Sequence, residues 1–357
     1  MATEARTPPG GYSPQLDGLR AVAVAGVAYS HWLPAWQFGV PLGAGVHLFF
    51  VLSGFLITRI LLGLRAMPDR GAAMARFYAR RAVRLFPAFY LVLGLAWLAD
   101  VPLVRDTWLW HAAYLSNLQI AADGRWQGHV SHFWSLAVEE QFYVVWPWLM
   151  VWSPGAWLGP LLGAAVLAGP LSRLVAASFG STEPFWALVP AGSADSLALG
   201  ALVAWRSWQR DDGATGARLP WPGGRLAVAA LLAWLALAAL DGLGRSATGL
   251  AVWRQGLQGV MFAWVVRRAV GGFAGVAGRA LAHPWTVYVG RISYGVYLIH
   301  AFAPVVVEWA LRGAGLEAFI PRQPALRALA AAATTLALAS VMWLLVERPF
   351  QRLKARV

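Results

Sequence analysis

Apolar runs of about 20 residues recur along almost the whole chain, and each is long enough to cross the hydrocarbon core of a bilayer as a helix. Hydrophobic residues make up 59% of the 357 positions and charged residues only 13%, which is about half the charged share of a typical soluble domain. This pattern argues against a water-soluble fold and predicts an all-α, polytopic integral membrane protein with about ten transmembrane helices. The runs are centred near Ala28, Gly54, Leu91, Tyr143, Val166, Ala198, Leu235, Ala263, Tyr297 and Leu336.

The organisation along the chain predicts a single membrane domain over residues 1–357, with no soluble domain. A polar N-terminal tail is expected at 1–15 and a basic cytoplasmic tail at 347–357. The first apolar run lacks a small-residue cleavage site after it, so we expect it to be a retained helix rather than a signal peptide. The segment 107–120 is apolar but short and contains polar residues, which indicates a re-entrant or interfacial segment, and its pattern leaves open whether it spans.

Arginines indicate the orientation of the predicted spans, because short cytoplasmic loops are enriched in basic residues. The clusters alternate best when both termini are cytoplasmic, although three arginines near the last outer loop run against the rule. The inner clusters are Arg65, Arg70 and Arg76, then Arg206, Arg210, Arg218 and Arg225, then Arg267, Arg268 and Arg279, and finally Arg348, Arg352, Lys354 and Arg356.

The overall charge and the cysteine count exclude several classes of function. The chain has 29 basic and 16 acidic residues, a net charge of +13, but the arginines stand mostly where apolar runs end and form no basic stripe. We therefore expect membrane lipids rather than nucleic acid as partners. The absence of cysteine excludes disulfides, thiolate metal sites and cysteine nucleophiles, and no metal site is predicted.

Charged residues inside a membrane span are costly, so each is a candidate for function. In the first run Arg20 and His31 are 11 residues apart, which returns them to one helical face within about 20° and separates them by roughly 16 Å. Asp17 precedes Arg20 by three residues and can pair with it. The structural alternative is an arginine that reaches the interface and an incidental histidine.

The third apolar run opens with three closely spaced arginines, Arg80, Arg81 and Arg84. At spacings of three and four residues their guanidinium groups can converge, and like charges repel unless an anion lies between them. A phosphate-rich ligand would supply that anion, since arginine matches phosphate with a planar set of donors. The alternative, especially for Arg80, is contact with anionic lipid headgroups.

The fourth run places His132, Ser135 and Glu139 on one helical stripe, whereas Glu140 points about 100° away. We therefore favour Glu139 as the functional acid and Glu140 as a structural one.

A third polar face is predicted where Ser293, Tyr297 and His300 recur at helical spacing. Helix-to-helix hydrogen bonds are an equally good explanation of this face. His47 is either a further contributor or an interfacial residue.

Counting residues along straight helices gives each group a depth. His31, Glu139 and His300 come to roughly 20 Å above the inner surface, and the arginines fall within the lowest roughly 10 Å. This arithmetic predicts a basic layer near the cytoplasm beneath a layer of histidine and glutamate.

At these residues the sequence closely resembles acyltransferase family three, the membrane O-acyltransferases of O-antigen and exopolysaccharide. The matching blocks occur in the expected order from Leu16 to Phe350. They are LDGLRAVAVAGVAYSH, GVHLFFVLSGFLITRIL, FYARRAVRLFPAFYLV, HFWSLAVEEQFYVVWPWL, GRISYGVYLIH and ERPF.

The resemblance implies a bacterial inner-membrane enzyme that transfers an acyl group, usually acetyl, from cytoplasmic acyl-CoA to a hydroxyl group of a glycan or glycoconjugate. It assigns function to Arg20 and His31, to Arg81 and Arg84, and to Glu139. Two departures stand out. Many relatives have Asp at the position of His47, and the arginine often found just before the acidic residue Asp195 is absent, with Ser193 near that place. No fused esterase-like domain is visible.

These assignments give a mechanistic hypothesis in which the arginines bind the phosphates of acyl-CoA and His31 is the general base. Glu139 orients the imidazole of His31 or carries its proton, and transfer is direct or passes through an acyl-histidine. Asp17, His132, Ser135, Tyr297 and His300 are expected to support the site or bind substrate. The alternatives are a transporter or flippase for a glycan or anionic solute, or an acyltransferase for a small molecule such as a macrolide. The sequence specifies neither the acceptor, the acyl length nor the oligomeric state.

Overall fold

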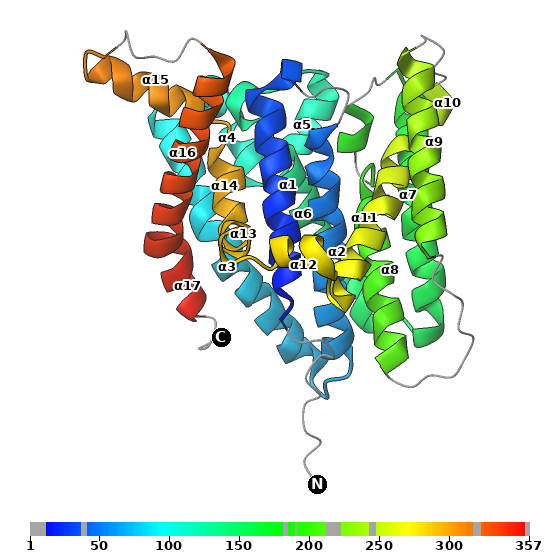
Figure 1. The fold of residues 1–357 in the computed structure, drawn as a ribbon. Coiled ribbons are helices and arrows are strands. Elements are labelled where there is room, and N and C mark those ends of the chain that lie inside the picture. The colour runs from blue at the N-terminus through cyan, green and yellow to red at the C-terminus, as the bar shows by residue number, and fades with distance from the viewer. Residues whose placement is uncertain are drawn as a thin grey trace.

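The computed structural model describes residues 12–36, 41–180, 185–189, 191–211, 223–242, 248–316 and 323–353, which are helical with no strand among them. The first half of the bundle comprises α1 (Pro14–Trp32), α2 (Gly45–Arg65), α3 (Arg70–Leu98), α4 (Val104–Ala112), α5 (Ser116–Asp123), α6 (Phe133–Trp152), α7 (Leu158–Ser178) and α8 (Ala194–Asp211) (Figure 1). The second half comprises α9 (Gly224–Gly242), α10 (Thr248–Ala251), α11 (Arg254–Gly271), α12 (Gly275–Leu281), α13 (Pro284–Arg291), α14 (Ser293–Ile299), α15 (Ala303–Gly313), α16 (Pro324–Met342), a π-helical turn (Trp343–Glu347) and α17 (Arg348–Arg352).

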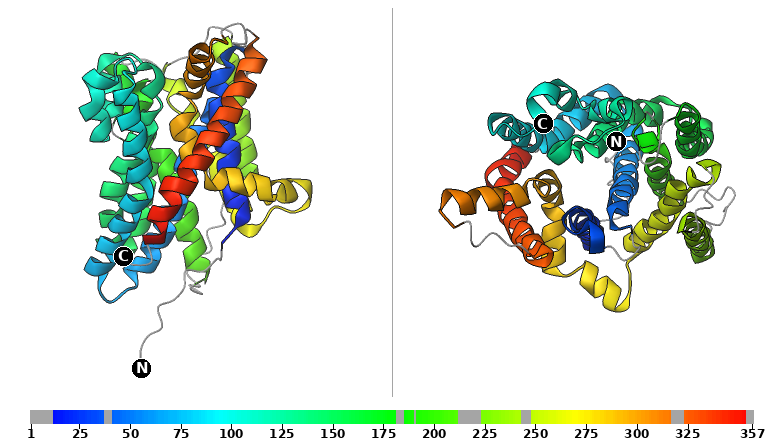
Figure 2. Two further views of the ribbon diagram at one scale, coloured as in Figure 1. Left: turned by 90° about the vertical axis from the view of Figure 1, so that its left-hand side faces the viewer. Right: turned by 90° about the horizontal axis from the view of Figure 1, so that it is seen from above.

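Helix α1 lies near the middle of the bundle, and the other helices surround it when the molecule is viewed from above (Figure 2). It packs against α2, α11, α12, α13, α14 and α16. The start of α1 and the end of α17 face the same side of the bundle (Figure 1). A central position brings the polar face of α1 next to the polar residues of several other helices.

Small residues let α2 and α8 cross with their backbones in contact. A Cβ atom added to Gly54 would lie 1.9 Å from the carbonyl oxygen of Leu197, and one added to Gly200 would lie 1.9 Å from that of Val51. No larger residue fits either position, and such close approach is typical of helix packing in membranes. This crossing fixes the face of α2 that turns toward α1 and α6.

The hydropathy of the described helices identifies fewer spans than the sequence predicted. All ten predicted centres lie in helices, but the number of spans is not confirmed: the single helices long and apolar enough to cross a membrane are Leu42–Arg65, Arg70–Leu98, Gly155–Ser178 and Pro324–Arg352, four in the part of the chain that the structure describes. Two bent helix pairs raise this number to six. Polar site residues explain part of the shortfall, because α1 and α6 contain several of them.

Two of the predicted spans are broken. Helices α11 and α12 are bent by 86°, and the helices that follow Ser293 are bent by 63° at the break after Ile299. The second break comes directly at His300, so the chain changes direction at a predicted site residue. Irregular backbone at membrane depth is tolerated where protein buries it.

The segment 107–120 forms parts of α4 and α5, which have 9 and 8 residues and are each too short to cross a bilayer. Helix α1 begins at Pro14 and Glu347 continues directly into α17, while residues 1–11 and 354–357 of the predicted tails lie outside the described residues.

Candidate functional site

Two histidines from different helices meet at one end of the bundle. His31 lies in the last turn of α1 and His300 follows α14. The Nδ1 atom of His31 is 2.7 Å from the Nε2 atom of His300, and the two rings are nearly parallel, at 9°. Sequence reasoning placed both residues at a similar depth, and the structure brings them into direct contact.

The hydrogen bonds of the pair define which nitrogens hold protons. The Nδ1 atom of His300 is 2.7 Å from the carbonyl oxygen of Tyr297. Because a carbonyl only accepts, this Nδ1 atom is the donor, and in neutral His300 the Nε2 atom is then an acceptor. His31 therefore donates from Nδ1 to His300, which leaves the Nε2 atom of His31 with a free lone pair.

The two imidazoles differ in exposure. His300 is completely buried, and its carbonyl oxygen accepts a hydrogen bond of 2.9 Å from the indole nitrogen of Trp32. His31 is exposed. The buried ring thus orients an accessible ring whose free nitrogen can take a proton from a substrate.

Ser135 and Tyr297, predicted on separate polar faces, form a hydrogen bond of 2.6 Å beneath the histidines. Both hydroxyls also lie within hydrogen-bond distance of the carbonyl oxygen of His132, Tyr297 at 3.0 Å and Ser135 at 3.3 Å, so either can be the donor within the pair. The ring of His132 packs 4.8 Å from that of His300, centroid to centroid. The two predicted faces therefore meet at Tyr297. Its side chain contacts Ser135, and its carbonyl oxygen accepts a hydrogen bond from His300.

A cavity lies on the other side of Tyr297. It contains about 930 Å³ of space between side chains, including the part open to solvent. One face of α2 lines it from Val46 to Ile60, which lie roughly 21 Å apart along the helix axis. The other lining residues that the argument uses are Arg20, Arg81, Arg84, Ser135, Glu139, Tyr143, Ser293, Tyr294 and Tyr297.

The three arginines of this cavity differ in their partners. Arg20 donates to Asp17 at 2.8 Å, as the sequence predicted. Arg81 lies over the ring of Tyr143, with its guanidinium carbon 3.8 Å from the ring centroid, and its buried Nε atom has no acceptor. Arg84 has no hydrogen-bond acceptor within the described chain.

Unpaired guanidinium groups facing a cavity favour an anionic ligand, because a cation held in low dielectric without a partner is costly. Arg80, which the sequence also offered, is exposed and does not line the cavity. The structure thus separates Arg81 and Arg84 from their neighbour.

Glu139 belongs to the arginine cavity and not to the histidines. Its carboxylate accepts hydrogen bonds from Ser53, at 2.8 Å, and from Tyr143, at 3.2 Å. The expected pairing of Glu139 with His31 is therefore wrong, since His300 is the partner of His31. The depth estimate was wrong because it assumed that all helices are straight and begin at the same height in the membrane. His132, at the beginning of α6, is level with the histidine pair, and Glu139 lies seven residues further along, roughly 10 Å away.

His47 and Glu140 are not part of the cavity lining. His47 packs against Phe50, with ring centroids 6.0 Å apart, and its Nδ1 atom is buried without a partner. Among the described residues no group of three or more histidine, cysteine or acidic side chains could hold a metal ion.

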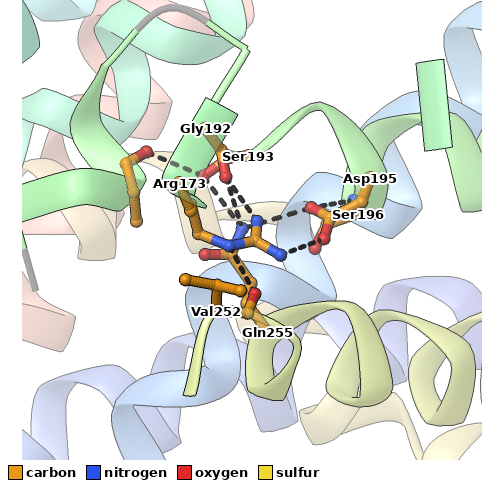
Figure 3. A network of polar contacts seen from close by, with 8 residues as sticks. Arg173, Gly192, Ser193, Asp195, Ser196, Val252 and Gln255 are labelled. Carbon is orange, nitrogen blue, oxygen red and sulfur yellow. Dashed lines mark hydrogen bonds and ion pairs between the residues drawn. The ribbon is translucent and has the colours of Figure 1, made fainter. Parts of the chain in front are cut away.

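Sequence reasoning missed a buried arginine that completes a network around Asp195. Arg173 of α7 is 1% exposed and bonds through each guanidinium nitrogen, to the carbonyl oxygens of Val252 and Gly192 at 2.8 and 2.6 Å, and to Asp195 at 2.7 Å (Figure 3). The cation that the resemblance led us to seek beside Ser193 thus comes from another helix. A single arginine in an otherwise apolar run was the signal for it.

Comparison with known proteins identifies the family of this chain. A family model described as an acyltransferase domain matches residues 13–344, nearly all of the chain. The chain therefore belongs to this acyltransferase family, which confirms the resemblance to acyltransferase family three. No solved structure is a significant match.

Curated relatives share one part of the chain. The peptidoglycan O-acetyltransferase OatA of Listeria monocytogenes is 36% identical over 157 residues, 38% of this chain and 24% of that protein. A Staphylococcus aureus (strain MSSA476) protein provisionally named an O-acetyltransferase is 38% identical over 154 residues, 39% of this chain and 25% of that protein. The aligned part is thus about a quarter of the length of these relatives.

Proposed function

We propose that this member of the acyltransferase family is a membrane O-acyltransferase that moves an acetyl group from acetyl-CoA to a hydroxyl group of a glycan. The observation that carries the proposal is the arrangement around Tyr297. Its side chain lines a cavity with unpaired arginines, and its carbonyl oxygen holds the histidine that orients His31. A site for an anionic donor and a base for a hydroxyl group therefore adjoin one another.

The donor binds through its phosphates to the arginines. Arg81 and Arg84 have donors to spare, and Arg20 is held by Asp17 toward the same cavity. Arginine suits this role because its planar donors bind phosphate oxygens in pairs. Along α1 the distance from Arg20 to His31 is roughly 16 Å, so the arm between the diphosphate and the thioester runs past Ser135 and Tyr297 toward the histidines.

His31 performs the proton transfer. Its Nε2 atom accepts the proton of the acceptor hydroxyl while the oxygen attacks the thioester carbonyl carbon. The carbon–sulfur bond then breaks, and the leaving thiolate takes the proton from His31, so the products are the O-acyl ester and free CoA. His300 stabilises the protonated ring by accepting from its Nδ1 atom. Glu139 does not touch His31 and instead sets the charge of the donor cavity.

The acceptor is a glycan, and peptidoglycan is the first candidate. The names of OatA and of YrhL of Bacillus subtilis, which is 39% identical over 154 residues, both refer to peptidoglycan. His31 is exposed at one end of the bundle, where a large acceptor can approach. With the arginine-rich loops in the cytoplasm of a bacterial cell, this end faces outward across the inner membrane, and both termini are cytoplasmic.

Transfer by the purified protein tests the function. In lipid nanodiscs, with acetyl-CoA and soluble peptidoglycan fragments, we expect ester-linked acetate on the glycan by mass spectrometry, which mild alkali removes. A protein that binds acetyl-CoA but acetylates no glycan would contradict the proposed acceptor. One that carries solute across a vesicle membrane without consuming acetyl-CoA would favour a transporter.

A matched pair of introduced cysteines tests the orientation. Ala66 and Ala122 are exposed alanines on opposite sides of the predicted membrane, and the chain has no native cysteine. In intact cells a membrane-impermeant thiol reagent should label Ala122→Cys and not Ala66→Cys. Labelling of Ala66→Cys and not of Ala122→Cys would place the arginine end of the cavity outside the cell, where cytoplasmic acetyl-CoA cannot reach it.

A further inference from the structure

Tyr143 is a buried residue of the cavity wall to which the proposed chemistry gives no role. It lies on α6 and is 4% exposed. The guanidinium carbon of Arg81, from α3, lies over its ring at 3.8 Å from the centroid. The face of an aromatic ring is negative and attracts a cation within about 6 Å, so the two side chains form a cation–π contact between α3 and α6.

Hydrogen bonds to α2 fix the part of α6 that holds this ring. Glu139, one turn before Tyr143, accepts a hydrogen bond from Ser53 of α2 at 2.8 Å. Trp146, three residues after Tyr143, donates from its indole nitrogen to the hydroxyl of Thr58 of α2 at 2.8 Å. Tyr143 is thus flanked along α6 by two bonds to the same neighbouring helix, and its ring is a fixed surface for the arginine that comes from α3.

The hydroxyl group of Tyr143 adds to the negative charge of the ring face. It donates to the Oε2 atom of Glu139 at 3.2 Å. A hydrogen bond to a carboxylate polarises the group that donates it, and in a phenol this shifts electron density toward the ring. Glu139 therefore strengthens the attraction for Arg81 through Tyr143, although no ion pair joins Glu139 to Arg81 in the part of the chain that the structure describes.

The charge of Arg81 is compensated in a different way from that of Arg20. Asp17 accepts a hydrogen bond from Arg20 at 2.8 Å and so occupies one of its N–H donors. The ring of Tyr143 attracts the charge of Arg81 without an oxygen acceptor, and Arg81 has no hydrogen bond to another described residue. A guanidinium group has five N–H donors, so those of Arg81 stay available to a ligand in the cavity while its charge is stabilised.

We propose that Tyr143 is a positioning residue for Arg81: its ring face holds the guanidinium group at the cavity wall and leaves the N–H donors for the phosphates of the acyl donor. The identity of that ligand rests on the proposed function, whereas the contact between ring and guanidinium group does not. It follows that the electron density of the ring, and not only its size, determines how tightly the cavity binds an anion.

Fluorinated rings at position 143 test this role most sharply. Phenylalanine analogues with one, two or three fluorine atoms keep nearly the size of the ring but remove negative charge from its face step by step. Relative to Tyr143→Phe, the Kd for acetyl-CoA in calorimetry should rise with each fluorine, to about tenfold for the most fluorinated ring, while kcat at saturating donor changes by less than about twofold. A Kd that does not depend on fluorination would overturn the proposal.

A double-mutant cycle with Arg81→Met shows whether the ring acts through Arg81. Tyr143→Leu, which removes the aromatic face, should weaken acetyl-CoA binding about tenfold in the wild-type background and by less than about twofold in the Arg81→Met background. Tyr143→Phe keeps the ring and loses only the bond to Glu139, so its Kd should rise about two- to threefold. Additive effects of Tyr143→Leu and Arg81→Met, or a Tyr143→Phe variant as weak as Tyr143→Leu, would contradict the proposal.

Tyr90→Leu is the matched control. It makes the same chemical change in a tyrosine of α3 whose hydroxyl donates to the carbonyl oxygen of Ala112 at 2.8 Å, outside the cavity. Its Kd for acetyl-CoA should equal the wild-type value. A rise as large as that of Tyr143→Leu would show that binding does not depend on the ring beside Arg81 in particular, and the proposal would be wrong.

The same variants distinguish this proposal from the function on which it rests. If the wild-type protein binds no acetyl-CoA, the proposed donor is wrong, and thermal unfolding of the fluorinated series without ligand then tests the contact alone. A Tm that falls with each fluorine in the wild-type background and not in the Arg81→Met background would show that the ring stabilises the cation. A Tm that fluorination leaves unchanged in both backgrounds would show that it does not, and the role of Tyr143 would be wrong as well.

Discussion

Arg173 and Arg84 are both cations inside the helix bundle, but they differ in their hydrogen-bond partners. Arg173 bonds an acceptor with each of its three nitrogens, and Gln255 completes the network around Asp195 (Figure 3). Arg84 has no acceptor within the described chain and faces a cavity. A saturated arginine ties helices together, whereas an unsaturated one at a cavity is available to a ligand.

The histidine pair repeats this contrast on a smaller scale. Both ring nitrogens of His300 are used, by Tyr297 and by His31. His31 uses one nitrogen and leaves the other free. Arg173 and His300, whose nitrogens all have partners, have a structural role. Arg84 and His31, which keep unused nitrogens, are the residues that we expect to bind or react with substrates.

The largest effect on stability should come from Arg173→Met. This change leaves Asp195 buried without its cation, which typically costs about 3–5 kcal/mol. We expect a large loss in free energy of unfolding in denaturant titrations, and partial recovery when Asp195→Leu is added, because an apolar pair can replace a buried ion pair. If Arg173→Met were as stable as the wild-type protein, the hydrogen bonds of Arg173 would not distinguish it from Arg84.

The next effect is on ligand binding, in Arg81→Ala and Arg84→Ala. Each loses charge-assisted hydrogen bonds to phosphate worth about 1.5–3 kcal/mol, so the Kd for acetyl-CoA should rise about 10- to 100-fold in calorimetry. The stability loss should be well below that of Arg173→Met, since no intramolecular hydrogen bond of Arg84 is broken. Unchanged affinity in both variants would mean that the cavity does not bind the donor.

A smaller effect is expected for Arg84→Lys. Lysine keeps the charge but not the planar set of donors, so the Kd should lie between those of wild type and Arg84→Ala, about three- to tenfold above wild type. A lysine variant as weak as the alanine variant would show that geometry rather than charge dominates.

The smallest effect is expected for Arg80→Ala. Arg80 is next to Arg81 in sequence but is exposed and outside the cavity, and surface substitutions usually change free energies by less than about 0.5 kcal/mol. The Kd for acetyl-CoA should stay within about twofold of wild type, and the free energy of unfolding within about 0.5 kcal/mol. A loss as large as that of Arg81→Ala would assign the effect to the surface charge of α3 rather than to the cavity.

The sequence predicted helix positions and shared faces because both follow from periodicity. All ten predicted centres lie in helices. Arg20 pairs with Asp17 for the same reason, since residues three apart on a helix are neighbours.

Partners on different helices could not be predicted in this way. Assigning Glu139 to His31 needed the relative heights and tilts of α1 and α6, which depend on tertiary packing. The burial of Glu347 was not predicted either, because this residue ends a π-turn, which a periodicity of 3.6 residues does not describe. Arg173 has the same residue type as Arg81, and only the three-dimensional structure shows that one is saturated and the other is not.

Acetyl transfer by His31→Gln tests the central claim most directly, that the free nitrogen of His31 moves the proton from the acceptor. Glutamine keeps a similar size and hydrogen bonding but does not cycle a proton, so transfer from acetyl-CoA to peptidoglycan fragments should fall about 10²–10⁴-fold while acetyl-CoA affinity stays at the wild-type value. His283→Gln, a change at an exposed histidine outside the site, is the matched control and should transfer at the wild-type rate. Transfer by folded His31→Gln above about a tenth of the wild-type rate would contradict the account.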